Sequence, residues 1–140
     1  MKPFEHYIDT KDVRKSSPDK ALAQSLIKDM HTRIELVSKL DVKNFSKIIF
    51  ENVYDALRDF CDALLALDGF KAYSHEAAIT YLKKYKFNDC EIAALDRFRY
   101  IRNGSKYYGK EISKDDALEI LDFFSQNKSR FNAIANEKIK

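Results

Sequence analysis

The chain has few of the residues that interrupt regular structure. Its 140 residues include only three glycines and two prolines. A sheet of many strands needs frequent turns, and turns draw on these two residue types, so their scarcity argues against such a sheet. The hydrophobic fraction of 45% is also too high for a disordered chain. A helical protein is the interpretation that remains.

Long apolar runs and closely spaced cysteines are also missing. No stretch approaches the roughly eighteen apolar residues of a membrane span, and residues 1–15 contain no apolar core of signal-peptide length. Cys61 and Cys90 lie far apart and in no ligand spacing, so we expect reduced thiols rather than a disulfide or a metal site. These absences predict a cytoplasmic protein with no membrane span, no metal and no cofactor.

The charge of the chain is nearly balanced. It has 25 basic and 22 acidic residues and a formal net charge of +3. Long-range attraction to nucleic acid is therefore weak unless basic groups cluster locally. A length of 140 residues is typical of one domain. We expect a polar leader over residues 1–15 and a single domain over residues 16–138, with only the termini loose.

Two long segments show the apolar repeat of an amphipathic helix. In residues 16–40 and 43–70, apolar side chains recur at steps of three or four, the spacing of one helix face. Ser17 and Pro18 are a typical N-cap and first helical residue. Gly69 suits a left-handed C-cap. The second segment has two apolar edges, so we expect it to be buried on more than one side.

Three further helices are expected in the rest of the chain. Ser74 and Ser113 are suitable N-caps, and another helix opens near Asn88 and is loosened at its end by Gly104. No segment shows the sustained alternation of a strand. The predicted fold is therefore all-α, an antiparallel bundle of about five helices.

Residues 96–113 concentrate basic and aromatic side chains, with five basic residues and three tyrosines in eighteen positions. Four of the cations would share one helix face, at steps of three, four and four: Arg99, Arg102, Lys106 and Lys110. Such a row can hold successive phosphates, and the interleaved tyrosines can stack unpaired bases. The alternative is a solvated helix face with buried tyrosine rings.

Most of the chain, from residue 17 to residue 136, resembles the HEPN superfamily, small helical bundles found in prokaryotes beside minimal nucleotidyltransferases. The resemblance rests on ENVYDALRDFCDALLALDGFKAYSHEA and on LDRFRYIRNGSKYYGKEIS. Arg102-Asn103 is similar to the Arg-Asn pair that opens the family signature, an arginine followed a few residues later by a histidine. Where that histidine is expected, this chain has Tyr107, Tyr108 and Gly109.

The resemblance implies a four-helix up-and-down core with an added short helix, and a homodimer in which two motifs meet. In active members it implies a metal-independent ribonuclease, whose arginine steadies phosphate charge while the histidine moves a proton at the ribose 2'-hydroxyl. In this chain the resemblance assigns the role of the arginine to Arg102, and Tyr107 is the residue closest in sequence to the expected histidine. An unperturbed tyrosine pKa of about 10 lies about three units above neutral pH. We therefore expect slow or absent cleavage but retained binding.

These considerations predict a protein that binds RNA or nucleotide phosphate through a basic face. The expected binding residues are Arg99, Arg102, Asn103, Lys106, Tyr108 and Lys110. The resemblance also implies a nucleotidyltransferase partner in a toxin–antitoxin-type pair, which could attach nucleotides to Tyr100, Tyr107 or Tyr108. Two alternatives stay open: an active ribonuclease that uses Arg102 with Tyr107 or Tyr108, and an interaction module that contacts only protein.

Three other side chains are candidates for supporting this site. Asp55 or Glu51 would orient Arg102 across the bundle, as a polar residue on this helix does in some relatives. The alternative is an ion pair with Arg58 within the same helix. His75 could replace the missing proton carrier if folding places it near Arg102. Otherwise it is an ordinary residue in the first turn of a helix.

Overall fold

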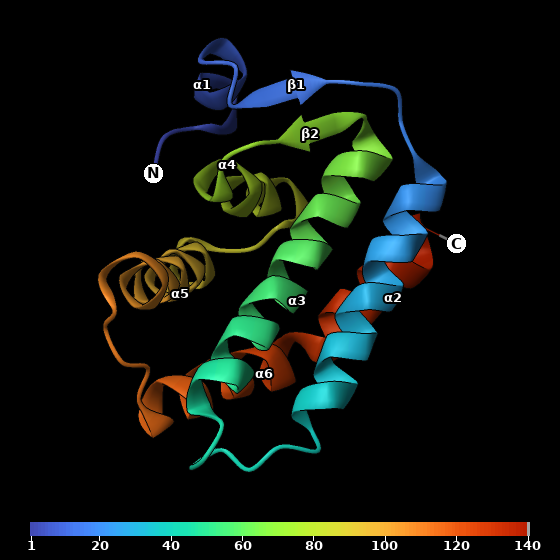
Figure 1. The fold of residues 1–140 in the computed structure, drawn as a ribbon. Helices are drawn as coiled ribbons and strands as arrows, with labels where there is room; N and C mark the ends of the chain where they lie inside the picture. The colour runs from blue at the N-terminus through green and yellow to red at the C-terminus, as the bar shows by residue number, and fades with distance from the viewer. Residues whose placement is uncertain (140) are drawn as a thin grey trace.

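The computed structural model describes residues 1–139, and these residues are mostly helical (Figure 1). The elements follow the chain in this order: α1 (Phe4–Asp9), β1 (Val13–Lys15), α2 (Lys20–Val37), α3 (Ser46–Asp68), β2 (Phe70–Ala72), α4 (His75–Thr80), the 3-10 helix η1 (Tyr81–Tyr85), α5 (Asp89–Tyr108) and α6 (Lys114–Lys138). The predicted all-α class is confirmed. Within residues 1–139 there are six α-helices instead of about five, because the leader contributes α1.

Helix α3 is the centre of the bundle. It runs antiparallel to α2, with α4 and α5 on its other side and α6 crossing behind it (Figure 1). Twelve of its residues are buried, among them Phe50, Tyr54, Phe60 and Leu64. The two apolar edges in the sequence therefore correspond to a helix that is buried on more than one side, as predicted.

Most of the predicted helix ends are confirmed. Gly69 caps α3 in the left-handed region, with a φ of +84°. The Ser74 hydroxyl accepts a hydrogen bond from the Ala77 N–H at the start of α4. Asn88 and Ser113 each form a capping box, in which the cap and the third helical residue satisfy each other's backbone N–H groups.

One predicted helix start is wrong. Helix α2 begins at Lys20 with Asp19 as its N-cap, not at Ser17. The chain before it is bound to the end of α3, because the Ser16 N–H donates to the Gly69 carbonyl at 2.8 Å and the Asp19 N–H donates to the Ala66 carbonyl at 2.9 Å. Helix α5 continues through Gly104 to Tyr108 and ends at Gly109, whose φ is +66°.

The leader, expected to be loose, forms α1 and β1. Strand β1 pairs antiparallel with β2, with Val13 opposite Ala72 and Arg14 opposite Lys71. Tyr7 and Val13 are buried in a small cluster with Ala77. A strand of three residues is too short for alternation to be recognised in the sequence. Among residues 1–139, no helix combines the length and the apolar character that crossing a bilayer requires.

Candidate functional site

Helix α5 divides the predicted site residues between two faces. Arg102 is directed toward α3, where its guanidinium carbon lies 5.4 Å from the centre of the Tyr54 ring. Tyr100, Tyr107 and Tyr108 are 67%, 66% and 79% exposed. The alternative of buried tyrosine rings is therefore wrong. We call the side that carries Arg99, Arg102 and Lys106 the inner face, and the side that carries Tyr100 and Tyr108 the outer face.

Arg102 keeps unused hydrogen-bonding capacity at the inner face. Its side chain is only 13% exposed, and its Nε lies 3.9 Å from Asp55 Oδ1, too far for a hydrogen bond. The Nε atom is buried and has no hydrogen-bond partner. A buried donor without a partner costs about 1–3 kcal/mol. Because Nε is enclosed by protein, an anion can reach this guanidinium only through its terminal nitrogens, for which no hydrogen bond is found within residues 1–139.

His75 lies beside Arg102, with Tyr54 between them. The Tyr54 hydroxyl and His75 Nδ1 are 2.9 Å apart, and the two rings are stacked with centroids 5.7 Å apart. Burial raises the pKa of Tyr54, so its hydroxyl stays protonated. In the tautomer whose hydrogen is on Nδ1, His75 donates to the Tyr54 oxygen, and Nε2 keeps a free lone pair. The sequence made a role for His75 depend on its lying near Arg102 in the folded dimer. Within one chain, His75 and Arg102 contact the same side chain, Tyr54.

The imidazole of His75 is neutral at neutral pH. Burial lowers its pKa to about 4, and the positive charges of Arg58, Arg102, Arg99 and Lys106 add to this effect. The inner face thus combines a neutral nitrogen base with several cations. This arrangement suits a phosphate group, whose charge the arginines balance while the imidazole can accept a proton.

Two of the nearby arginines are held by partners within the protein. Arg58 donates from Nε to Asp62 Oδ1 at 3.0 Å and from Nη2 to the Ala72 carbonyl at 3.2 Å. Arg99 donates from Nε to Asp96 Oδ1 at 2.8 Å, and its Nη2 lies 3.7 Å from Glu76 Oε1. Their charges are therefore largely balanced, which leaves Arg102 and Lys106 as the principal cations for a ligand at this face.

The predicted ion pair of Glu51 or Asp55 with Arg58 does not form. Arg58 binds Asp62 instead, and Glu51 makes no ion pair within residues 1–139. Asp55 lies between two arginines, 3.8 Å from Arg33 Nη1 and 3.9 Å from Arg102 Nε. Of the two predicted supporting residues, only Asp55 forms an ion pair with Arg102 within residues 1–139.

Lys110 does not continue the row of cations. The helix ends at Tyr108, and the chain turns back so that the Lys110 N–H donates to the Gly104 carbonyl at 3.1 Å. Its side chain lies over Gly104. Together with Tyr100, Asn103 and Tyr108 it lines a hollow of about 500 Å³ on the outer face.

Tyr107 is on the exposed surface, with the Lys106 ammonium 5.8 Å from its ring centre. Within the described residues, no hydrogen bond joins its hydroxyl to Arg102 or to His75. The side chain that stands nearest the family's histidine in sequence is therefore not the one that lies nearest Arg102 in space.

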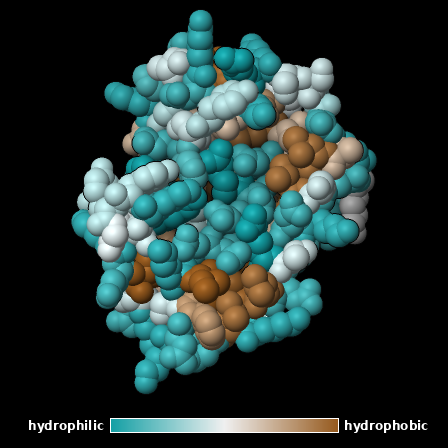
Figure 2. Space-filling view, in the orientation of Figure 1, coloured by the Kyte–Doolittle hydropathy of each residue, from teal (hydrophilic) through white to brown (hydrophobic). Residues whose placement is uncertain are grey.

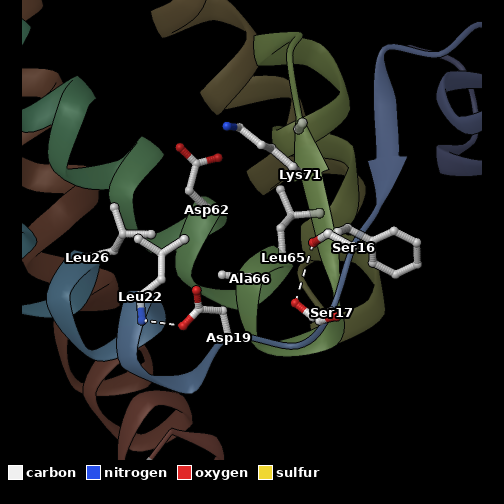
Figure 3. Close-up of a pocket in the computed structure, with 11 residues that line it drawn as sticks. Ser16, Ser17, Asp19, Leu22, Leu26, Asp62, Leu65, Ala66 and Lys71 are labelled. Atoms are coloured by element: carbon white, nitrogen blue, oxygen red, sulfur yellow. Dashed lines mark hydrogen bonds between the residues drawn. The ribbon is translucent and has the colours of Figure 1, made fainter.

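A second hollow lies between the start of α2, the end of α3 and β2 (Figure 3). It has a volume of about 330 Å³, and Leu22, Leu26 and Leu65 line it together with the charged side chains of Asp62 and Lys71. Asp62 is also the partner of Arg58, whose positive charge contributes to the lowered pKa of His75.

Tyr54 is the site residue that sequence reasoning missed. Tyr54 belongs to an apolar edge of α3, where an aromatic residue indicates the core and nothing more. Only the packing of α3 against α4 and α5 brings its hydroxyl to His75 and its ring to Arg102. Among residues 1–139, no group of His, Cys, Asp and Glu side chains is arranged to hold a metal ion.

Comparisons of this chain with protein-family models, with curated proteins and with solved structures found no match in any of the three.

Proposed function

We propose that this chain binds RNA, or another ligand that carries phosphate groups, through the inner face of α5. The observation that carries the proposal is the Arg102 guanidinium, which makes no hydrogen bond within residues 1–139 and has Asp55 as a carboxylate neighbour at 3.9 Å. Lys106, on the same face, is exposed and forms no ion pair within residues 1–139. A phosphate oxygen satisfies the guanidinium and is attracted by both charges.

The proposal includes a HEPN-like homodimer. Its basis is the resemblance in residues 17–136 together with exposed apolar side chains that a second copy can cover. Leu36, Phe45 and Ile48 are 47%, 41% and 46% exposed near the turn between α2 and α3. Figure 2 shows hydrophobic residues gathered near this turn and also near the start of α2. Contiguous exposed apolar side chains are typical of interaction surfaces.

The resemblance further supports a cytoplasmic nucleotidyltransferase as partner in a toxin–antitoxin-type pair. Such a partner would transfer a nucleotide from a nucleoside triphosphate to a tyrosine hydroxyl near the motif, with pyrophosphate as the leaving group. Tyr100, Tyr107 and Tyr108 are all exposed enough to be reached.

A metal-independent ribonuclease is the second candidate function, and the position of His75 favours it. His75 lies beside Arg102 through Tyr54 and is neutral at neutral pH, so it can accept a proton. Its pKa of about 4 makes it a weak base, which predicts slow cleavage. In this scheme His75 takes the role that the sequence assigned to Tyr107.

The test is incubation of the purified protein with end-labelled RNA in the presence of a metal chelator, with both cleavage and retention on a filter measured. We expect Arg102→Ala to weaken retention about tenfold or more, because a charge-assisted hydrogen bond is lost. The dependence of affinity on salt should also become shallower, since one phosphate contact is removed. Arg14→Ala, which removes an exposed arginine from β1, is the matched control and should change neither quantity.

Each outcome of this assay decides between the candidates. Equal retention by the parent protein and by Arg102→Ala would contradict binding through the inner face. Cleavage by the parent that is lost in both Arg102→Ala and His75→Ala would establish the ribonuclease. Neither retention nor cleavage would leave the interaction module that contacts only protein.

A further inference from the structure

The hollow on the outer face of α5 is built from groups that recognise a nucleobase. Tyr100 and Tyr108 are two turns apart on α5, and Asn103 and Gly104 lie between them. Both tyrosine rings are largely exposed, at 67% and 79%. Exposed aromatic rings beside a cationic groove are the platform on which unpaired bases stack.

The polar groups of the hollow are free to bind a ligand. Within residues 1–139, the Asn103 amide makes no side-chain hydrogen bond and the Lys110 ammonium makes no ion pair. No carboxylate lines the hollow, so its only charge is positive. The hollow therefore offers stacking surface, one amide and one cation, which matches a nucleotide with its base and phosphate.

We propose that this hollow holds an unpaired adenine base of the bound RNA strand, with Lys110 on an adjacent phosphate. The proposal deepens the function proposed above and rests on it, because the same strand contacts Arg102 on the inner face. Arg102 and Asn103 are consecutive residues of α5. The helix with its side chains is about 10–12 Å across, so a single strand that crosses its end can reach both faces.

Adenine is favoured by the chemistry of the Asn103 amide, which offers one donor and one acceptor side by side. Adenine presents the complementary pair on its N6/N7 edge, the usual partner of asparagine. On the corresponding edge guanine offers two acceptors, at N7 and O6, and a pyrimidine offers a single polar group. Pyrimidines also have a smaller surface to stack on the tyrosine rings.

The test measures affinity by fluorescence anisotropy for labelled single-stranded oligo(A), oligo(C) and oligo(U) of equal length. We expect the parent protein to prefer oligo(A). Tyr108→Ala should weaken binding of all three oligonucleotides about tenfold, since one stacking contact is lost. Asn103→Ala should remove the preference for oligo(A) and leave the binding of oligo(C) and oligo(U) nearly unchanged.

Tyr73→Ala is the matched control. Tyr73 is 57% exposed like the tyrosines of the hollow but lies between β2 and α4, beside Arg14 and Lys71. We expect this variant to bind as the parent does. Circular dichroism and the molecular mass in solution are measured for every variant. Both should stay unchanged for Tyr73→Ala and Tyr108→Ala, because these side chains are exposed.

The results separate this inference from the function on which it rests. Weaker binding by Arg102→Ala, with Tyr108→Ala unchanged, would overturn the base site and leave the inner face as the phosphate site. Equal affinity of the parent for the three oligonucleotides would overturn the assignment of adenine. A dimeric parent that becomes monomeric with Tyr108→Ala would show that a second copy of the chain occupies the hollow. No binding of any oligonucleotide by the parent would overturn both proposals.

Discussion

At the scale of single residues, Tyr54 is the side chain that joins His75 to Arg102. Its hydroxyl meets His75 and its ring faces Arg102, so one side chain of α3 positions groups from α4 and α5. The cations that face His75 come from two elements: Arg58 from α3, and Arg99, Arg102 and Lys106 from α5. They oppose protonation of the imidazole, so protonation of His75 lowers the free energy of unfolding.

We expect His75 to make the fold less stable in mild acid. Its pKa is about 4 in the folded protein, below the ordinary value of 6.5. Between these values the unfolded chain binds a proton at His75 that the folded chain does not, so the free energy of unfolding falls as pH is lowered from 6.5 to 4. His75→Asn should remove this loss, so the parent should become less stable relative to the variant over that range. Urea unfolding of both proteins at several pH values measures it.

The comparison of parent and variant isolates His75 from another titrating group. Burial raises the pKa of Asp59 to about 6, which gives a pH dependence of opposite sign. Asp59 is present in both proteins and cancels in the difference. Parallel stability curves for the parent and His75→Asn would show that the folded environment does not lower the pKa of His75.

At the scale of elements, the ends of the helices place the site. The capping boxes at Asn88 and Ser113 fix where α5 and α6 begin, and the left-handed Gly109 ends α5 so that Lys110 can turn back over Gly104. Gly69 likewise ends α3 in the left-handed conformation. Its carbonyl also accepts a hydrogen bond from the N–H of Ser16, which precedes α2. The two left-handed glycines differ in their surroundings, which allows a matched comparison.

We expect Gly69→Ala to be more destabilising than Gly109→Ala. A Cβ at Gly69 would lie 2.7 Å from the Ser16 carbonyl oxygen, whereas a Cβ at Gly109 would have no atom within 4 Å. Left-handed backbone costs a residue with a side chain about 1–2 kcal/mol, so Gly109→Ala should lower the free energy of unfolding by that amount. Gly69→Ala should lower it by more, because backbone must move as well. Denaturant unfolding gives both values, and equal losses would contradict the close contact.

At the scale of the whole molecule, the leader is part of the fold and is linked to the site. Its strand β1 completes a two-stranded sheet with β2. The Tyr7 hydroxyl donates to Glu76 Oε2 at 3.5 Å, and the other oxygen of Glu76 lies 3.7 Å from Arg99. The first residues of the chain therefore pack on the helix that carries His75.

Removal of residues 1–15 should lower the stability of the remaining helices without unfolding them. Tyr7 and Val13 are 6% and 2% exposed, and burial of such a side chain contributes about 1.5–3 kcal/mol. We expect the truncated protein to keep a helical circular dichroism spectrum and to unfold at a lower denaturant concentration. Val13→Ala should show part of this loss, and Arg14→Ala, whose side chain is exposed on the same strand, should show none. An unchanged midpoint after truncation would contradict the packing of the leader.

The sequence by itself determined the features that depend on neighbours along the chain. Apolar spacing indicated the all-α class and the central position of α3. The caps at Gly69, Ser74, Asn88 and Ser113 were predictable because capping is a local hydrogen-bond arrangement within about four residues. The concentration of cations and tyrosines in residues 96–113 was likewise visible without a fold.

Tertiary structure alone decided which of these residues meet. His75 is 27 positions before Arg102, and only the packing of α3, α4 and α5 brings Tyr54 between them. Lys110 does not lie in the predicted row of cations because α5 ends at Gly109. The leader forms a strand because β1 pairs with β2. A periodic pattern gives the direction of a side chain on its own helix, whereas the partner across the interface depends on how distant segments pack.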